Sequence, residues 1–409
     1  MVKIWGTIPE DSLAFTLEIF NKQNVNSYSV TYTEVKENQI SSALITALAD
    51  GQAPDLILAP SYIILQNVKR LNLIPQNVIS EIDFRNIFVD ASQILISSQG
   101  YLGLPVSVNP LIMYYNRDLL SSAGLTNPPA TWDQFFDYES QITRFNDENN
   151  ESLKISTIAL GTYNNIPNIT DIIMAMIMQI KQGPPISRSF EKDTRGNLNA
   201  NYQILFNENL KNLEVTPGTL NTVLAFMQKF SNPKEATYNW HHLMPNALSQ
   251  FLIGKLAFYI GYASELNYIK SANQKLYFDY TYLPQVAKTN INTTYGKLYT
   301  LSMLKNSQNP AATYAALLNF TTGSQSASLA AATGGLSALK ARLAASQGNQ
   351  ASVISGRSGL IAKSFYNLYP QKLEALMKIA IESIYTGQSD TVAAEKKLIE
   401  NLQAIYDGK

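Results

Sequence analysis

The sequence predicts an α/β protein with more than one packed body, and three observations lead to this prediction. Short apolar strands alternate with amphipathic helices from the first residues onward, and strands are expected at 2–5, 28–32 and 55–60. This β-α-β-α-β order gives a parallel sheet with helices on both faces. The length of 409 residues favours two domains over one core. Apolar runs at 102–106 and 111–115 are separated by a polar step, as where a chain crosses between two packed bodies.

The helices between the first strands are amphipathic. Leu13, Leu17 and Phe20 recur at helical spacing and share one face, and residues 40–48 repeat the pattern before Gly51 ends the helix. Parallel sheets bind ligands at the carboxyl ends of their strands. The loops that follow the first and third strands are therefore the expected place for a site.

Residues further along the chain follow the same rules of periodicity. An apolar helix at 171–182 ends at the Gly-Pro-Pro step 183–185. Residues 187–216 show little periodicity, so we expect irregular surface structure there. The other expected elements are helices at 220–230, 310–320, 325–332 and 391–406 and strands at 255–261, 277–284 and 296–303.

Composition and charge argue against several classes of function. Lys and Arg total 31 and Asp and Glu total 31, so nothing favours a nucleic acid or an anionic membrane surface as the partner. Cysteine is absent, which excludes disulfides, thiolate metal sites and cysteine nucleophiles. No apolar run approaches the roughly 18 residues of a transmembrane helix. No signal-peptide pattern precedes the first strand, so we expect an export signal to have been removed ahead of Met1.

Catalytic motifs are also missing from the sequence. The two histidines, His241 and His242, are adjacent, whereas a helical metal pair needs i, i+4 spacing to place both rings on one face. No GxSxG, GxxxxGK[ST] or GxGxxG pattern occurs. We therefore expect no catalytic residue, no metal and no cofactor. A pair of carboxylates assembled in space is the open alternative.

Several motifs in the same order resemble one known family. The marker is a stretch that reads PVSV at 105–108, YYNRDLL at 114–120 and PPATWDQFF at 128–136. Further matches are GQAPD at 51–55, KLAFYIG at 255–261, YFDYTYLP at 277–284, which lacks a second proline, and TGGLS at 333–337, where serine replaces the usual proline. The chain resembles the bacterial extracellular solute-binding proteins of the maltose-binding type, which are the ligand receptors of ABC importers.

This resemblance implies a fold and a domain organisation. The expected fold is the two-lobed periplasmic-binding-protein fold of type II, with discontinuous lobes joined by hinge strands around a central ligand cleft. It implies a first lobe of residues 1–110 plus 296–337 and a second lobe of residues 111–295 plus 338–409. The hinges are expected near 107–111 and 292–299 and at the turn 334–337. Such receptors close around their ligand.

The resemblance also implies a function. It implies a monomeric receptor that captures a small polar solute, most often a carbohydrate or oligosaccharide, and delivers it to the membrane subunits of an ABC importer. The implied location is extracytoplasmic, in the periplasm or at the cell surface, and a lipid anchor in the precursor stays open. The alternatives are a non-sugar ligand, such as a peptide or an amino-acid-derived compound, and a cleft enzyme that acts on glycosides.

Candidate ligand contacts of the first lobe follow its strands. Trp5 could stack on the apolar face of a sugar, or it could seal the sheet as a core residue. Glu10 and Asp11 lie in the next loop, where sugar-binding relatives carry polar contacts, although Asp11 is better explained as a helix cap. Ser61 and Tyr62 follow the third strand and offer a hydroxyl and a phenol.

Three candidates lie near the expected crossings. Asn109 could bridge ligand hydroxyls, satisfy bent hinge backbone, or do both. Tyr115 belongs to an apolar strand and could face the core or the cleft. Gly335 could let the backbone approach the cleft or form the third crossing, or it could be a plain turn glycine.

The remaining candidates belong to the second lobe. Trp240 could form a second stacking wall, but core packing explains it at least as well. Tyr262 follows a strand at the position where the family often supplies an aromatic contact. Ser264 could contact the ligand or cap the next helix.

Overall fold

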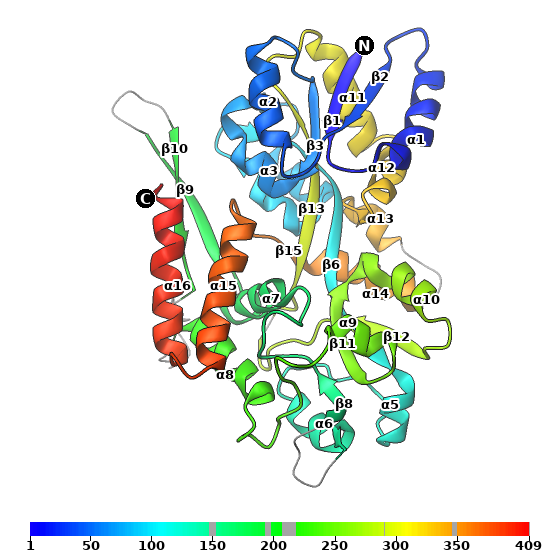
Figure 1. Cartoon of the computed structure of the whole chain (residues 1–409). Coiled ribbons are helices and arrows are strands. Elements are labelled where there is room, and N and C mark those ends of the chain that lie inside the picture. The colour runs from blue at the N-terminus through cyan, green and yellow to red at the C-terminus, as the bar shows by residue number, and fades with distance from the viewer. Residues whose placement is uncertain (147–152, 193–197, 207–217, 290, 346–349, 409) are drawn as a thin grey trace. The chain divides into compact units, whose positions relative to one another are not determined.

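A computed structural model describes residues 1–146, 153–192, 198–206, 218–289, 291–345 and 350–408 (Figure 1). The chain divides into two compact units. Unit 1 contains Met1–Pro110 and Gly296–Ser364, and unit 2 contains Leu111–Tyr295 and Phe365–Lys409. Each unit is therefore assembled from two separate pieces of the chain.

The last boundary between the units differs from the expected one. Residues 338–364 belong to unit 1, not to the second lobe. The reason is strand pairing on both sides of this segment. The short strand β14 (Leu336–Ser337) pairs with the unit 1 part of β6, and β15 (Ala362–Lys363) pairs with β13 before the chain leaves unit 1.

Unit 1 is built on a sheet with helices packed against it (Figure 1). Strands β1 and β2 are parallel, as are β1 and β3, and β13 runs antiparallel to β3 and β6. The strand order is β2-β1-β3-β13-β6. This confirms the α/β class, because α1 and α2 connect strands that run parallel in one sheet. The elements of the first piece are β1 (Val2–Gly6), α1 (Glu10–Gln23), β2 (Val30–Glu34), α2 (Ile40–Ala49), β3 (Leu56–Pro60), α3 (Ser61–Gln66), η1 (Val68–Arg70), α4 (Glu81–Ile87), η2 (Asp90–Leu95), β4 (Ile96–Ser97), β5 (Gly100–Tyr101) and β6 (Leu104–Asn116). Those of the second piece are β13 (Thr294–Met303), α11 (Pro310–Thr321), α12 (Ser326–Ala332), β14, α13 (Lys340–Ala344), α14 (Gln350–Ile361) and β15.

Helix α1 joins the two pieces of unit 1 through its apolar face. Phe20 is fully buried, and its ring stacks on Phe320 of α11 with 4.8 Å between the ring centroids. Leu13 of the same face is also buried. The predicted periodicity of this helix is thus confirmed.

Strand β6 passes through the polar step without a break. Residues 104–116 form one strand, whereas the sequence predicted two strands with a kink between them. Pro110 has no N–H group to donate to a neighbouring strand. The polar step is nevertheless part of the sheet, because Asn109 pairs with Lys297 and Pro110 with Gly296 on β13. The irregularity lies in β6 itself, where Ser107 is opposite Tyr299 and Pro105 is opposite Thr300, so that Val106 is the extra residue.

Unit 2 is built on a second set of strands around the end of β6. Strands β11 and β12 pair antiparallel with β6, and β8 pairs parallel with β11. Tyr114 of β6 is fully buried there, and its ring centroid lies 6.1 Å from that of Tyr259 and 5.8 Å from that of Tyr280.

The elements of unit 2 that follow β6 are α5 (Arg117–Ser122), α6 (Phe135–Ile142), β7 (Arg144–Phe145), β8 (Leu153–Ile158), α7 (Ile169–Lys181), β9 (Ile186–Lys192), β10 (Leu198–Ile204), α8 (Thr219–Ser231), α9 (Ala247–Leu252), β11 (Leu256–Tyr262), η3 (Ala263–Glu265), α10 (Leu266–Ala272), β12 (Phe278–Tyr282), α15 (Pro370–Tyr385) and α16 (Thr391–Tyr406).

Two paired strands, which we call the β9–β10 hairpin, occupy part of the expected irregular segment. Strands β9 and β10 pair antiparallel from Ile186 opposite Ile204 to Lys192 opposite Leu198. The hairpin is held by Gln403 of α16, whose amide nitrogen donates to the carbonyl of Tyr202 at 3.0 Å. The expectation of irregular structure was wrong for these strands, because the alternation of LNANYQI at 198–204 is a strand pattern. Residues 193–197 and 207–216 of the expected segment lie outside the described residues.

Candidate functional site

The carboxyl ends of the unit 1 strands gather aromatic, hydroxyl and carboxylate side chains. We call this set the unit 1 loop cluster. The phenol of Tyr62 donates to Glu37 Oε1 at 2.7 Å, and the hydroxyl of Thr7 donates to the phenol oxygen of Tyr299 at 3.3 Å. The members of the cluster are Trp5, Thr7, Glu34, Glu37, Tyr62 and Tyr299.

A close contact between strands β1 and β2 shapes this cluster. Gly6 ends β1, and a Cβ atom there would lie 2.7 Å from the ring of Tyr32 and 2.8 Å from the carbonyl oxygen of Leu58. The phenol of Tyr32 both accepts from the N–H of Ile8 at 3.1 Å and donates to its carbonyl at 2.7 Å. Burial raises the pKa of Tyr32, so the phenol stays protonated and fixes the loop after β1.

Glu10 and Asp11 are exposed and lie in the first turn of α1. Asp11 does not cap this helix, because the helix begins at Glu10 and Pro9 holds the cap position without a side-chain hydrogen bond. The carboxylate of Glu34 accepts from the N–H of Glu10 at 3.1 Å and so satisfies a free N–H group at the start of α1. The expected capping role of Asp11 is therefore wrong.

Trp5 and Ser61 occupy positions that agree with the sequence expectation for strand ends. Trp5 lies in β1, and its side chain is half-buried, so it is not sealed inside the core. Ser61 is also half-buried and is the first residue of α3, directly after β3. Their contact with a ligand stays a prediction.

Unit 2 brings a second group of aromatic and acidic side chains together. We call it the unit 2 tyrosine cluster. The phenol of Tyr262 donates to Asp171 Oδ2 at 2.7 Å, and the phenol of Tyr259 donates to Glu265 Oε2 at 2.7 Å. The backbone N–H of Tyr262 donates to Glu265 Oε1, also at 2.7 Å. The members of the cluster are Tyr163, Asp171, Tyr259, Tyr262, Glu265 and Tyr295.

Local sequence places the carboxylates of this cluster. Asn168 adopts a left-handed conformation with φ of 59° directly before α7, which puts Asp171 in the first turn of that helix. Carboxylates are favoured there by the free N–H groups and the helix dipole. Glu265 lies three residues after Tyr262 and reaches back to its N–H, as in a capping box.

The phenols of the unit 2 tyrosine cluster are held in their neutral form. Burial raises the pKa of Tyr262 well above its ordinary value, and the nearby carboxylate of Asp171 raises it further. Burial and the charges of Asp171 and Glu374 raise the pKa of Tyr295 in the same direction. Burial also raises the pKa of Tyr163. These groups therefore act as hydrogen-bond donors and acceptors at neutral pH, not as bases.

Trp240 lies in the core of unit 2. Its side chain is 0% exposed, and its indole N–H donates to Asn165 Oδ1 at 3.1 Å. Asn165 is itself fixed by the carbonyls of His241 and Met244. Trp240 is therefore a core residue, as the second alternative predicted. A role as a stacking wall is wrong, because the buried indole has no ring face open to a ligand.

Tyr115, another expected contact, lies apart from the unit 2 tyrosine cluster. Tyr115 is half-buried and pairs with Phe258 on β11, whereas Tyr262 pairs with Leu111. Four residues of strand correspond to about 13 Å, so β6 carries Tyr115 away from Tyr262. Burial raises the pKa of Tyr115, and the carboxylate of Asp279 adds to the effect.

The last three candidates take different positions. Asn109 is half-buried in β6, and Ser264 is exposed in η3 beside Tyr262. Gly335 packs on β6, because a Cβ atom there would lie 2.8 Å from the hydroxyl oxygen of Ser107. It therefore allows the turn at 333–337 to approach the strand, and the chain leaves unit 1 elsewhere.

The cluster members that sequence reasoning missed are Thr7, Glu34, Glu37 and Tyr299 in unit 1 and Tyr163, Asp171, Tyr259, Glu265 and Tyr295 in unit 2. Asp171 did carry a usable signal, because it is the one acidic residue at the start of an otherwise apolar helix. Tyr295 carried none, because its place beside Asp171 depends on a strand that is far away in the sequence.

No group of three or more His, Asp or Glu side chains in the described ranges could hold a metal ion. Among those residues, no helix is both long and apolar enough to span a bilayer.

Solved structures show which class of fold this is. The sugar-binding protein MalE from Xanthomonas citri aligns with a TM-score of 0.74 and 16% identity over 100% of this chain and 97% of that protein. The cyclic α-maltosyl-1,6-maltose binding protein from Arthrobacter globiformis aligns with a TM-score of 0.73 and 15% identity over 100% and 99% of the two chains. These likenesses show the two-lobed α/β fold of periplasmic binding proteins.

The sequence itself shows the family. The chain belongs to the family described as bacterial extracellular solute-binding protein, which matches residues 16–352. That description places its members outside the cytoplasm. A binding protein of Brucella abortus (strain 2308) is 29% identical over 108 residues, and the chain spans only 26% of the length of this curated relative.

Proposed function

We propose that the protein is the solute receptor of an ABC importer and that its solute is a carbohydrate, in particular an oligosaccharide. The observation that carries the proposal is the family match over residues 16–352. The sugar assignment is supported by the chemistry of the two clusters and by the sugar-binding names of structural neighbours.

The side chains of the unit 1 loop cluster suit a sugar. The half-buried indole of Trp5 can stack on the apolar face of a pyranose ring. Carboxylates such as Glu37 accept hydrogen bonds from sugar hydroxyls, and phenols such as Tyr62 both donate and accept. The neutral phenols of the unit 2 tyrosine cluster have the same capacity. Such groups recognise an uncharged, hydroxyl-rich solute.

The first test is thermal unfolding of the protein with a panel of mono- and oligosaccharides, with amino acids, peptides and polyamines as the counter-set. A ligand at 100 times its dissociation constant adds about 2.7 kcal/mol to the free energy of unfolding, which gives a clear rise in Tm. A rise with one class of sugar is expected. A rise with the counter-set alone would overturn the sugar assignment and leave the family unchanged.

Site variants then test the residues. Trp5→Ala is expected to weaken sugar binding by about tenfold or more in calorimetry, as loss of a stacking anchor does. Phe15→Ala is the matched control, because Phe15 is an aromatic residue of α1 that is 70% exposed and outside the cluster. Equal affinities of the wild type and Trp5→Ala would remove Trp5 from the site.

The further parts of this proposal concern partners, turnover and closure. We expect a monomer that delivers its solute to the importer's membrane subunits and releases it unchanged. Mass spectrometry of the recovered sugar would check that it is unchanged.

A lipid anchor in the precursor stays a prediction, testable on protein isolated from its native membrane. Closure on solute binding also stays a prediction, and small-angle X-ray scattering with and without sugar would test it.

A further inference from the structure

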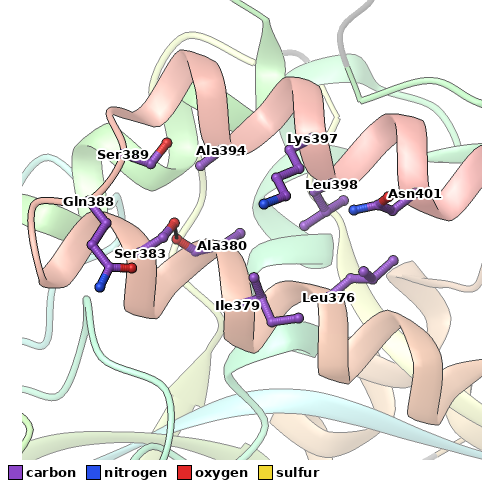
Figure 2. Close-up of a pocket in the computed structure, with 10 residues that line it drawn as sticks. All are labelled: Leu376, Ile379, Ala380, Ser383, Gln388, Ser389, Ala394, Lys397, Leu398 and Asn401. Atoms are coloured by element: carbon purple, nitrogen blue, oxygen red, sulfur yellow. Dashed lines mark hydrogen bonds between the residues drawn. The ribbon is translucent and has the colours of Figure 1, made fainter.

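A pocket opens between the last two helices of unit 2. It is open to solvent on one side, has a volume of about 190 Å³ and lies between α15 and α16, near the turn that joins them (Figure 2). It shares no residue with the unit 1 loop cluster or the unit 2 tyrosine cluster. Its lining residues are Leu376, Ile379, Ala380, Ser383, Gln388, Ser389, Ala394, Lys397, Leu398 and Asn401.

The wall of this α15–α16 pocket is apolar. Helical spacing puts Leu376, Ile379 and Ala380 of α15 on one face, opposite Ala394 and Leu398 of α16. Ile379 is 55% exposed although it is a large aliphatic side chain. A body of hydrocarbon placed here would cover apolar surface that now faces water.

The polar side chains of the pocket include one ammonium group, two amides and two hydroxyls. Lys397 and Asn401 both extend from α16 into the space between the helices (Figure 2). Within the described part of the chain, Lys397 forms no ion pair, and the side-chain amides of Asn401 and Gln388 have no hydrogen-bond partner. One unpaired ammonium group with two free amides favours a single negative charge.

Three acidic side chains of the two helices are bonded to groups outside the pocket. Asp390 caps α16 by accepting from the N–H of Ala393 at 2.7 Å. Glu382 accepts from Asn164 at 2.6 Å, and Glu395 accepts from the N–H of Asn221 at 3.1 Å. Glu400, three residues after Lys397 on α16, is exposed and forms no ion pair with it in the described part of the chain, so the charge of Lys397 is available to a ligand.

The volume limits the size of such a ligand. An apolar cavity of about 150 Å³ holds a benzene molecule. A pocket of about 190 Å³ can therefore take one ring with a short head group. We propose that the α15–α16 pocket is a second binding site, distinct from the solute site, and that it takes a small organic carboxylate with a compact apolar body.

The test uses three ligands with the same ring and different head groups. Saturation-transfer NMR is run on the full chain with benzoate, benzyl alcohol and benzylamine. Benzoate is expected to bind saturably with a dissociation constant of about 1–10 mM, because so few non-hydrogen atoms limit the affinity. The neutral alcohol is expected to bind about fivefold more weakly, because it loses the charge pair with Lys397, and the amine is expected not to bind.

Two variants locate the binding. Lys397→Gln is expected to weaken benzoate about fivefold and to leave benzyl alcohol unchanged. Lys396→Gln is the matched control, because Lys396 is the neighbouring exposed lysine and does not line the pocket. Ser383→Leu fills the pocket and is expected to abolish binding of both ligands, with folding checked by thermal unfolding.

Three results with the ligands and with Lys397→Gln would each overturn the proposal. They are a lack of saturable benzoate binding in the range of about 1–10 mM, equal benzoate affinity in the wild type and Lys397→Gln, and benzylamine binding as tight as benzoate binding. Weakening by Lys396→Gln to the same extent as by Lys397→Gln would also overturn it, because it would show only a general effect of surface charge.

Discussion

The hydroxyl of Tyr262 illustrates how single atoms organise unit 2. It is buried, and it donates a hydrogen bond to the carboxylate of Asp171 at the start of α7. Removing that donor leaves a buried Asp171 oxygen without this hydrogen bond. The free energy lost is therefore larger than for an exposed phenol.

We expect Tyr262→Phe to lower the free energy of unfolding by about 1.5–3 kcal/mol, which is the range for a hydrogen bond to a charged group. Urea denaturation monitored by circular dichroism measures this. Tyr268→Phe is the control and should change stability by no more than about 0.5 kcal/mol, because Tyr268 is 56% exposed. A loss equal to that of the control would show that the bond to Asp171 contributes nothing to stability.

Gly6 gives a second prediction at the residue scale. A methyl group at this position would lie 2.8 Å from the backbone carbonyl of Leu58, which cannot move without shifting β3. Gly6→Ala is expected to lower the free energy of unfolding by about 1–3 kcal/mol. Gly183→Ala is a suitable comparison, since the nearest atom to its added Cβ lies 3.8 Å away. Similar unfolding midpoints for both variants would contradict the steric argument.

At the scale of elements, α16 supports α8 through a buried carboxylate. Glu395 of α16 is 6% exposed, and it accepts from the N–H of Asn221 in the first turn of α8. Burial raises the pKa of Glu395 above its model-peptide value of 4.5, although the backbone N–H groups oppose this effect. The folded state therefore holds this proton more tightly than the unfolded state does.

Raising the pH through and above 4.5 should weaken the contribution of Glu395 to stability. That contribution is complete below the unfolded pKa and is lost as the pH rises through the higher folded pKa. In Glu395→Gln this loss is absent, so the stability of the variant relative to the wild type should rise between about pH 4 and pH 7. Denaturation curves across that range measure the difference.

Glu400→Gln provides the reference for this pH series, because Glu400 lies on the exposed side of the same helix. Its difference from the wild type should stay nearly constant with pH. A constant difference for Glu395→Gln as well would show that its carboxyl has the same pKa in the folded and unfolded states.

The hairpin β9–β10 depends on α16 in a similar way. Gln403 accepts from the N–H of Ile204 at 3.2 Å and donates to the carbonyl of Tyr202, so one side chain holds the backbone of β10. Gln403→Ala is expected to speed amide hydrogen exchange at residues 200–204 more than at β8 or β11, because local opening needs fewer bonds broken. Uniform faster exchange across unit 2 would point to a global loss of stability instead.

At the scale of the molecule, the discontinuous units determine what can fold alone. Residues 111–295 lack α15 and α16, which pack on α7 and α8 and belong to the same unit. A fragment of residues 111–295 is therefore expected to unfold without a cooperative transition. The same fragment with residues 365–409 joined to it by a short linker should unfold cooperatively. Calorimetry of the two fragments makes the comparison, and a cooperative transition for the shorter one would contradict the assignment of α15 and α16.

Much of the fold was accessible from sequence because it depends on local periodicity. The apolar spacing of α1, the Gly-Pro-Pro end of α7 and the boundaries of α16 at residues 391 and 406 all follow from neighbouring residues. Family motifs added the two-lobed fold. The paired strands β9 and β10 were missed because the alternating segment of β10 is rich in asparagine, which is uncommon in strands.

The candidate site was less accessible, because it depends on contacts between distant residues. The sequence alone determined that polar and aromatic side chains follow the strands, that Trp5 and Tyr62 are among them, and that the chain has the motifs of a solute-binding family. Only the tertiary structure decided that Trp240 is buried, that Tyr262 bonds to Asp171, and that residues 338–364 stay in unit 1. The physical reason is that periodicity reports which face of an element is apolar, whereas burial and hydrogen bonding depend on which other element covers that face.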